Sequence, residues 1–231
     1  MTETAQRPIH DVRFPGESAE YRAARDGLLE AEMALRRQTE AVAAQRRALP
    51  PGGKIPEDYV FTEGKDARPV RLSELFGDKP TLLLYNYMYG PAVARPCPSC
   101  TAMLDALDGE APHITHRVAL AVVARSPIAR IRDVATERGW RNLRLISSSG
   151  NRFNIDYKGE TAEGDQRPIL HVFVRDTDGA IRHSWASELA FAPTEPGQNP
   201  RHIDAIWPVW AAFDLTPEGR GADTHTKLSY D

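Results

Sequence analysis

The sequence lacks the features of several large protein classes. Its 29 Lys and Arg nearly balance 32 Asp and Glu, and a net charge of -3 argues against general binding to nucleic acid. No apolar run approaches the ~20 residues of a membrane span, and the polar start of the chain lacks the apolar segment of a secretory signal. We therefore expect a cytoplasmic protein that binds neither membranes nor nucleic acid.

Sequence repeats and the common cofactor motifs are also missing. We find no low-complexity tract, no P-loop, no glycine-rich dinucleotide fingerprint and no Ser-His-Asp arrangement. We accordingly expect no organic cofactor. The composition, with 41% hydrophobic and 26% charged residues, is ordinary for a globular protein and is sufficient for a hydrophobic core.

Cysteine is scarce, and both cysteines lie in one motif, Cys97-Pro98-Ser99-Cys100. In a reducing compartment, such a close pair is more often catalytic or metal-binding than a structural disulfide. The motif is therefore interpreted as a redox pair, as half of a zinc site, or as two cysteines without a function.

The first 53 residues are predicted to hold a tail and one long helix over residues 18–49, with Ser18 as its N-cap. Pro50 and Pro51 end this helix. An apolar stripe repeats every seven residues and must be buried, either against its own domain or against a subunit neighbour, in which case the protein forms a homodimer through this helix. The stripe consists of Tyr21, Leu28, Leu35, Val42 and Leu49.

Residues 54–215 are predicted to form one α/β domain, and residues 216–231 a loosely held tail. Apolar runs predict strands at 81–89, 117–124 and 143–148, two short strands within 59–77, and a hairpin of 169–176 with 180–187 through Asp178-Gly179. One helix is expected from the cysteine motif to Gly109, and a second over 126–138, with Ser126 as its cap and Gly139 at its end. A last helical segment is expected to open at Asn199-Pro200 and to restart at Pro208. Trp207 and Trp210 are expected in the core or at an interface.

The cysteine motif follows a strand and starts a helix, which favours thiol chemistry. Pro98 suits the first helical position, and the free N–H groups and the helix dipole then favour a Cys97 thiolate. Arg95 would add positive charge. Cys100 shares a face with Cys97 and continues toward Leu104, so it should be the more buried sulfur. We predict that Cys97 is the nucleophile and Cys100 the resolving thiol.

Two further groups of residues are candidates for the site. Pro168 lies just before a predicted strand, where it either faces the cysteines and shapes a substrate groove or is an ordinary trans proline. His113 and His116 follow the cysteines at a spacing similar to that of zinc ligands, but a helix between them would carry the histidines away. We therefore expect no metal, and we interpret His171 and His183 as core or edge histidines.

Three stretches carry a family resemblance: residues 75–91 (LFGDKPTLLLYNYMYGP), the CPSC motif with Asp108-Gly109 after it, and residues 213–221 (FDLTPEGRG). They resemble the thioredoxin-like family catalogued as domain of unknown function 899, over nearly the whole chain. The resemblance implies a thioredoxin-like sandwich with a peroxiredoxin-like front β-hairpin. It also implies a dithiol-disulfide oxidoreductase that acts on a protein or small-molecule disulfide through Cys97 and Cys100, with Pro168 as a weaker match.

Departures from related patterns leave the chemistry open. Pro96 replaces the tryptophan that precedes the first cysteine of thioredoxin, so the reduction potential does not follow from the resemblance. Gly90 and Ala94 stand where peroxiredoxins have the proline and hydroxyl residue of their peroxide pocket, which is therefore expected to be absent. The alternative is an inactive thioredoxin-like module that binds partners or dimerises.

Overall fold

The computed structural model describes residues 9–196, 204–221 and 225–230, and it divides into two compact units, Met1–Pro50 and Pro51–Asp231. The first unit contains one long helix, α1 (Ala19–Arg47), and the hydroxyl of its predicted N-cap Ser18 accepts a hydrogen bond from the backbone N–H of Tyr21. The apolar stripe of this helix is exposed, since Leu28 and Leu35 are 51% and 68% accessible.

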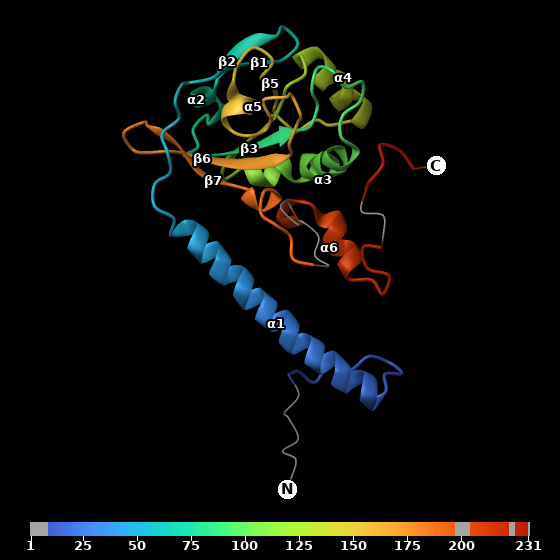
Figure 1. The fold of residues 1–231 in the computed structure, drawn as a ribbon. Coiled ribbons are helices and arrows are strands. Elements are labelled where there is room, and N and C mark those ends of the chain that lie inside the picture. The colour runs from blue at the N-terminus through green and yellow to red at the C-terminus, as the bar shows by residue number, and fades with distance from the viewer. Residues whose placement is uncertain (1–8, 197–203, 222–224, 231) are drawn as a thin grey trace. The chain divides into compact units, whose positions relative to one another are not determined.

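The second unit is built on a seven-stranded sheet in the order β2-β1-β5-β4-β3-β6-β7 (Figure 1). Strands β3, β4 and β5 are parallel, whereas β6, β7 and the hairpin β1–β2 join antiparallel to their neighbours. The strands are β1 (Val60–Glu63), β2 (Arg68–Arg71), β3 (Thr81–Tyr87), β4 (Ala119–Ala124), β5 (Leu145–Ser147), β6 (Ile169–Arg175) and β7 (Ile181–Ala186).

Both faces of the central strands are buried, which explains their continuous apolar runs. On β3, Tyr85 and Tyr87 point into one core cluster, and Leu82 and Leu84 point into the other. Helices α3 (Pro98–Thr115), α4 (Ile128–Arg138) and α6 (Pro208–Asp214) contribute to the first cluster, whereas α2 (Leu72–Leu75) and α5 (Phe153–Asp156) lie on the side of the second. Two 3-10 turns, Glu188–Ala190 and Asp204–Ile206, follow β7.

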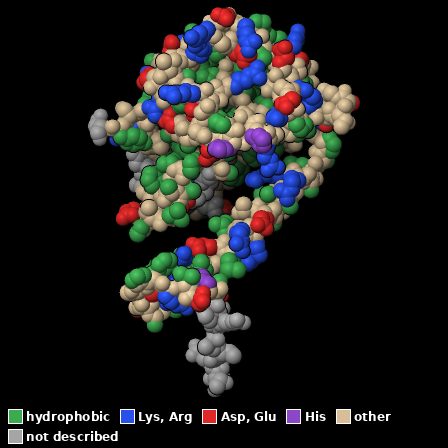
Figure 2. All heavy atoms as spheres, turned by 180° about the vertical axis from the view of Figure 1, so that it is seen from behind, with side chains coloured by type: hydrophobic (Ala, Val, Ile, Leu, Met, Phe, Trp, Pro, Cys, Tyr) green, Lys and Arg blue, Asp and Glu red, His purple; other side chains and the backbone are tan. Residues whose placement is uncertain are grey.

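This arrangement is the predicted thioredoxin-like sandwich, extended by the front hairpin β1–β2 and preceded by the long helix α1. On the face of the second unit shown in Figure 2, positive and negative side chains are interspersed, in keeping with the nearly balanced charge. The described helices include none that is both long and apolar enough to cross a membrane.

The outer strand β7 is paired along part of its length by the segment that opens the second unit. The N–H of Ile55 donates to Ile181 O, and the N–H of His183 donates to Gly53 O, each at 3.0 Å. Only glycine fits at residue 52, since a Cβ there would lie 1.8 Å from the carbonyl oxygen of His183. Residues 52–55 therefore run antiparallel against β7.

The predicted end of the cysteine-bearing helix at Gly109 is wrong, because α3 continues to Thr115. Pro112 lies inside this helix and cannot donate to the carbonyl of Asp108. The side-chain amide of Asn142 donates to that carbonyl instead, at 3.0 Å. A partner from a distant loop thus lets the helix continue past Pro112.

The start of α4 also differs from the prediction by one residue. Pro127 is the N-cap rather than the first helical residue, and Ser126 lies outside the helix. The buried hydroxyl of Ser126 donates to Gly90 O at 3.0 Å, so it anchors the loop after β3 and does not cap the helix. Gly139 closes α4 with a φ of 75°, as predicted.

The last described residues of the chain pack on the domain, although they were predicted to form a loosely held tail. Pro208 restarts a helix and Trp207 and Trp210 are buried, as predicted, whereas Asn199-Pro200 lies outside the described residues. In residues 225–230, Thr226 is buried and the carbonyl of Leu228 accepts a hydrogen bond from Arg138 at 2.6 Å. This part of the predicted tail therefore packs on the domain.

Candidate active site

Cys97 is the N-cap of α3, and Pro98 occupies the first helical position, as predicted. The loop that follows β3 brings Cys97 back to the strand, because its N–H donates to Met88 O at 3.1 Å. The sulfur of Cys97 accepts a hydrogen bond from the backbone N–H of Cys100 at 3.4 Å. The first turn of the helix therefore directs free donors at this sulfur.

The electrostatics of Cys97 favour its ionised form. The pKa of Cys97 is lowered to about 6, mainly by a hydrogen bond from the Cys100 side chain. The backbone N–H groups of Cys100 and Ser99 and the charge of His225 lower it further, whereas partial burial opposes the shift. A thiol with such a pKa is mostly thiolate at neutral pH and is therefore a ready nucleophile.

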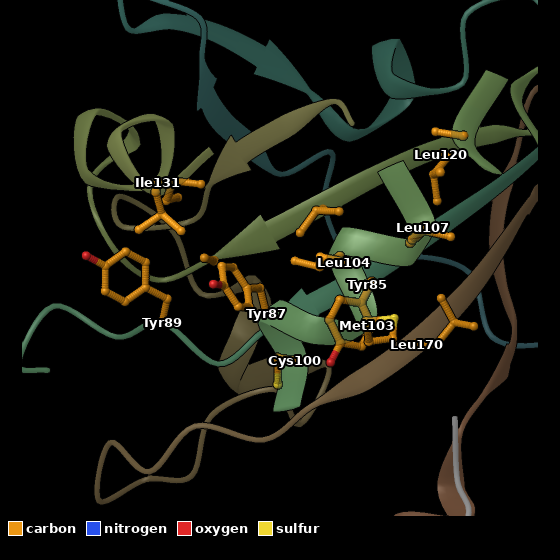
Figure 3. Close-up of a cluster of buried hydrophobic side chains, with 14 of the residues drawn as sticks. Tyr85, Tyr87, Tyr89, Cys100, Met103, Leu104, Leu107, Leu120, Ile131 and Leu170 are labelled. Atoms are coloured by element: carbon orange, nitrogen blue, oxygen red, sulfur yellow. The ribbon is translucent and has the colours of Figure 1, made fainter. Parts of the chain in front are cut away.

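Cys100 has the opposite character. It is 2% exposed and belongs to the core cluster beneath α3, together with Met103 and Leu104 (Figure 3). The hydrogen bond to the Cys97 sulfur, burial and the negative charge of Cys97 hold the pKa of Cys100 well above its usual range, whereas the hydroxyl of Tyr85 acts in the opposite direction. A half-buried sulfur that favours the thiolate thus lies three residues before a buried thiol, which agrees with the burial predicted for the pair.

A short hydrogen-bond chain ties the start of α3 to β3. The hydroxyl of Thr101 donates to Cys97 O at 2.9 Å, and the hydroxyl of Tyr87 lies 2.7 Å from Thr101 Oγ1. Because the single proton of the Thr101 hydroxyl is already used, Tyr87 must be the donor to Thr101. Both residues are buried, so this chain holds the carbonyl of Cys97 in place.

The guanidinium of Arg95 is committed to another partner. It donates to both carboxylate oxygens of Glu137, at 2.8 and 2.5 Å, on an exposed surface. The same pairing raises the pKa of Arg95 and lowers that of Glu137. The positive charge predicted near Cys97 is thus largely neutralised by a carboxylate.

Pro168 directly precedes β6, in the loop beside the end of β3. The side-chain amide of Asn86 donates to Arg167 O at 2.5 Å, and Asn86 is paired in the sheet with Ile169. All peptide bonds of the described residues are trans, that of Pro168 included. The proline loop therefore borders the strand end from which the cysteine loop departs.

The zinc alternative gains no support from the described residues. His113 lies in the last turn of α3 and His116 caps its end, and both are exposed. In the described part of the chain, no group of three or more His, Cys, Asp or Glu side chains is placed to hold a metal ion.

His171 and His183 line a separate pocket of about 710 Å³ between the end of α5, β6, β7 and the turn after β7. His171 Nδ1 lies 3.1 Å from His183 Nε2, and His171 is buried among aromatic rings. Burial, and to a smaller extent His183, lower the pKa of His171 to about 3. Both residues are neutral parts of the core and its edge, as predicted.

Sequence reasoning missed Tyr85, Tyr87, Thr101 and His225 as parts of the site. The two tyrosines could have been found from the sequence, because residues two apart on a strand point to the same face of the sheet. The helix that carries the cysteines packs on one face of β3, so a pair of side chains on that face lies beneath it. Thr101 stands one residue after the second cysteine, where a hydroxyl can reach the carbonyl four residues back. Nothing in the sequence signals that His225 lies near Cys97.

Comparison with known proteins places the chain in a family and gives distant structural matches. The model of one family, described as "Bacterial protein of unknown function (DUF899)", matches residues 12–230. No curated protein matches the sequence.

Several solved structures are similar at low identity. A peroxiredoxin-like protein from Aquifex aeolicus matches with a TM-score of 0.42 and 16% identity, over 60% of this chain and 75% of that one. Peroxidoxin BcpB from Mycobacterium tuberculosis matches with a TM-score of 0.42 and 18% identity, over 69% and 94%. Thioredoxin peroxidase I from Plasmodium yoelii matches with a TM-score of 0.43 and 19% identity, over 71% and 90%.

Proposed function

The chain belongs to the DUF899 family of bacterial proteins, and we propose that it is a thiol-disulfide oxidoreductase with Cys97 as nucleophile and Cys100 as resolving thiol. One observation carries the proposal: a partly accessible sulfur with a pKa of about 6 lies three residues before a buried thiol at a helix start. Disulfide exchange needs a thiolate that can reach its substrate and a second thiol that can reach the first.

The reaction proceeds in two exchanges. The Cys97 thiolate attacks one sulfur of a substrate disulfide, which forms a mixed disulfide and releases the other substrate sulfur as a thiolate. Cys100 then loses its proton and attacks the Cys97 sulfur, which closes the Cys97–Cys100 disulfide and releases the second substrate thiolate. The substrate gains two electrons, and a thiol reductant must return the protein to its dithiol form.

The surroundings of the two sulfurs support this order of attack. A protein or small-molecule disulfide can approach Cys97, but it cannot approach Cys100, which is 2% exposed. We include Pro168 in the substrate-facing surface, because its loop borders the end of β3. Arg95 contributes less, because Glu137 already pairs with its charge. The setting that we propose is the cytoplasm, where a reducing environment returns the dithiol.

Trapping of partners by a Cys100→Ser variant tests the proposal. Without the resolving thiol, the mixed disulfide at Cys97 cannot be released internally, so partners should accumulate as adducts that reductant removes. Mass spectrometry of the adducts identifies both the partner and the cysteine that holds it.

A Cys97→Ser variant is the matched control, because it keeps the buried thiol and loses the partly accessible one. It should trap nothing. If Cys100→Ser forms no adduct under mild oxidation with either cell extract or a small disulfide, or if both variants trap equally, the assignment is wrong.

Helix α1 supports a second candidate, an inactive module that assembles with another copy of itself. Its exposed stripe of Tyr21, Leu28 and Leu35 repeats every seven residues and therefore lies on one face of the helix, which a second copy of the protein can cover. A Leu28→Lys/Leu35→Lys variant should turn a dimer into a monomer in light scattering. Dimerisation together with failed trapping would favour the module, whereas a monomeric wild-type protein would exclude it.

A further inference from the structure

The resolving step requires a negative charge on the sulfur of Cys100, which is buried and has little access to water. Cys100 packs in the core cluster beneath α3. In the dithiol form, the hydrogen bond to Cys97 and burial hold its pKa well above the usual range. Once Cys97 is bonded in the mixed disulfide, its charge is gone, and burial remains as the cause that disfavours the Cys100 thiolate. To attack the mixed disulfide, this sulfur must nevertheless become a thiolate. A polar group close to Cys100 is therefore needed to stabilise the negative charge.

Tyr85 supplies a hydroxyl in the right place. The residue is fully buried in the middle of β3, on the face that α3 covers, and it belongs to the same core cluster as Cys100. Figure 3 shows its hydroxyl directed toward the end of α3 that carries Cys100. Among the described residues, this buried hydroxyl forms no well-aligned hydrogen bond, and the cysteine side chain on which it acts is that of Cys100. A buried hydroxyl that is incompletely satisfied is costly in a core and calls for an explanation.

The neighbouring Tyr87 provides the contrast. It occupies the same face of β3 two residues later, but its proton is already donated to Thr101, which in turn donates to the carbonyl of Cys97. The hydroxyl of Tyr87 therefore has a structural partner. The hydroxyl of Tyr85 keeps a proton that can be donated to an acceptor that forms during the reaction.

We propose that Tyr85 is a hydrogen-bond donor to the Cys100 thiolate during the resolving step. This inference rests on the proposed function of the two cysteines. Cys100 gives up its proton to solvent, and Tyr85 keeps its own proton while its hydroxyl donates to the sulfur. When Cys100 bonds to Cys97 and the substrate sulfur leaves as a thiolate, the negative charge departs with it. The effect of Tyr85 on Cys100 in the dithiol form, a lowered pKa, has the sign that this role requires.

Two-step release of a chromophoric thiolate from an aromatic disulfide, 5,5′-dithiobis(2-nitrobenzoate), tests the role of Tyr85. The first thiolate reports attack by Cys97, and the second reports resolution by Cys100. In stopped-flow measurements, Tyr85→Phe should leave the first rate within about twofold. It should slow the second roughly tenfold and move its pH midpoint upward, as expected when a hydrogen bond to a charged group is lost. Tyr87→Phe is the matched control and should leave the pH midpoint of the second step unchanged.

A second variant guards against a Tyr85→Phe protein that does not fold. Tyr85 replaced by 3-fluorotyrosine keeps nearly the same volume and donates a stronger hydrogen bond, so it should speed the second release. If both variants resolve at the wild-type rate and pH midpoint, Tyr85 has no such role although the exchange reaction stands. If the wild-type protein never releases a second thiolate, the proposed function itself fails.

Discussion

Replacing Cys100 by alanine should raise the pKa of Cys97, because the Cys100 side chain is the largest cause of its lowering. The lowering from the ordinary value of 9.0 to about 6 corresponds to about 4 kcal/mol in favour of the thiolate. One hydrogen bond to a charged group contributes about 1.5 to 3 kcal/mol of this, which is about one to two pKa units. The backbone N–H of Cys100, 3.4 Å from the sulfur, survives the substitution.

Cys97 should accordingly titrate near pH 7 to 8 in Cys100→Ala, about one to two units above the wild-type value. A Cys100→Ser variant is the matched control, since its hydroxyl can still donate to the sulfur and should hold the pKa closer to 6. The difference between the two variants isolates the side-chain donor from any general effect of removing the buried thiol.

The rate of alkylation of Cys97 by iodoacetamide between pH 4 and about 10 measures this pKa, because only the thiolate reacts. Each variant contains a single cysteine, so mass spectrometry follows one reaction. Equal midpoints in the two variants would refute the assigned role of the Cys100 side chain. A midpoint near 9 in the wild-type protein would refute the low pKa of Cys97 altogether.

Three further substitutions test the fold and the site. Asp108→Ala removes a buried acceptor of three backbone N–H groups in residues 141–143 and should cost about 3 kcal/mol of unfolding free energy, measured by urea denaturation. The pKa of His171 is about 3 in the folded protein, so between pH 6.5 and 5 only the unfolded chain binds a proton at this residue. The free energy of unfolding should therefore fall by about 2 kcal/mol from pH 6.5 to 5. The fall should be smaller in a His171→Gln variant. His225→Ala should raise the pKa of Cys97 by a fraction of a unit in the alkylation assay, and an unchanged midpoint would show that the imidazole does not act on the sulfur.

Much of the fold follows from local patterns in the sequence. The run over 81–89 predicts a strand buried on both faces, and β3 has this character. Pro98 after a cysteine predicts the helix start, because its fixed φ and missing N–H suit that position alone. The burial of Cys100 follows from its place on the same helical face as Leu104. In each case the deciding interaction lies within a few residues of the pattern.

The predictions that were wrong concern residues whose structure depends on a hydrogen-bond or ion-pair partner far away in the sequence. Gly109 and Pro112 are strong signals for a helix end, but the amide of Asn142 donates to the carbonyl that Pro112 leaves free. Arg95 precedes Cys97 in the sequence, yet its charge is taken by Glu137, 42 residues later. No local pattern encodes either pairing, so neither could be predicted before the fold was known.

Gly52 has a consequence for how copies of this protein can meet. An outer strand normally presents bare peptide groups, onto which a neighbouring molecule can add its own strand and start a stack. Here residues 52–55 of the same chain form backbone hydrogen bonds with residues 181–183, and Gly52 allows the two main chains to approach this closely. Along that stretch, another molecule has no free peptide groups on which to continue the sheet.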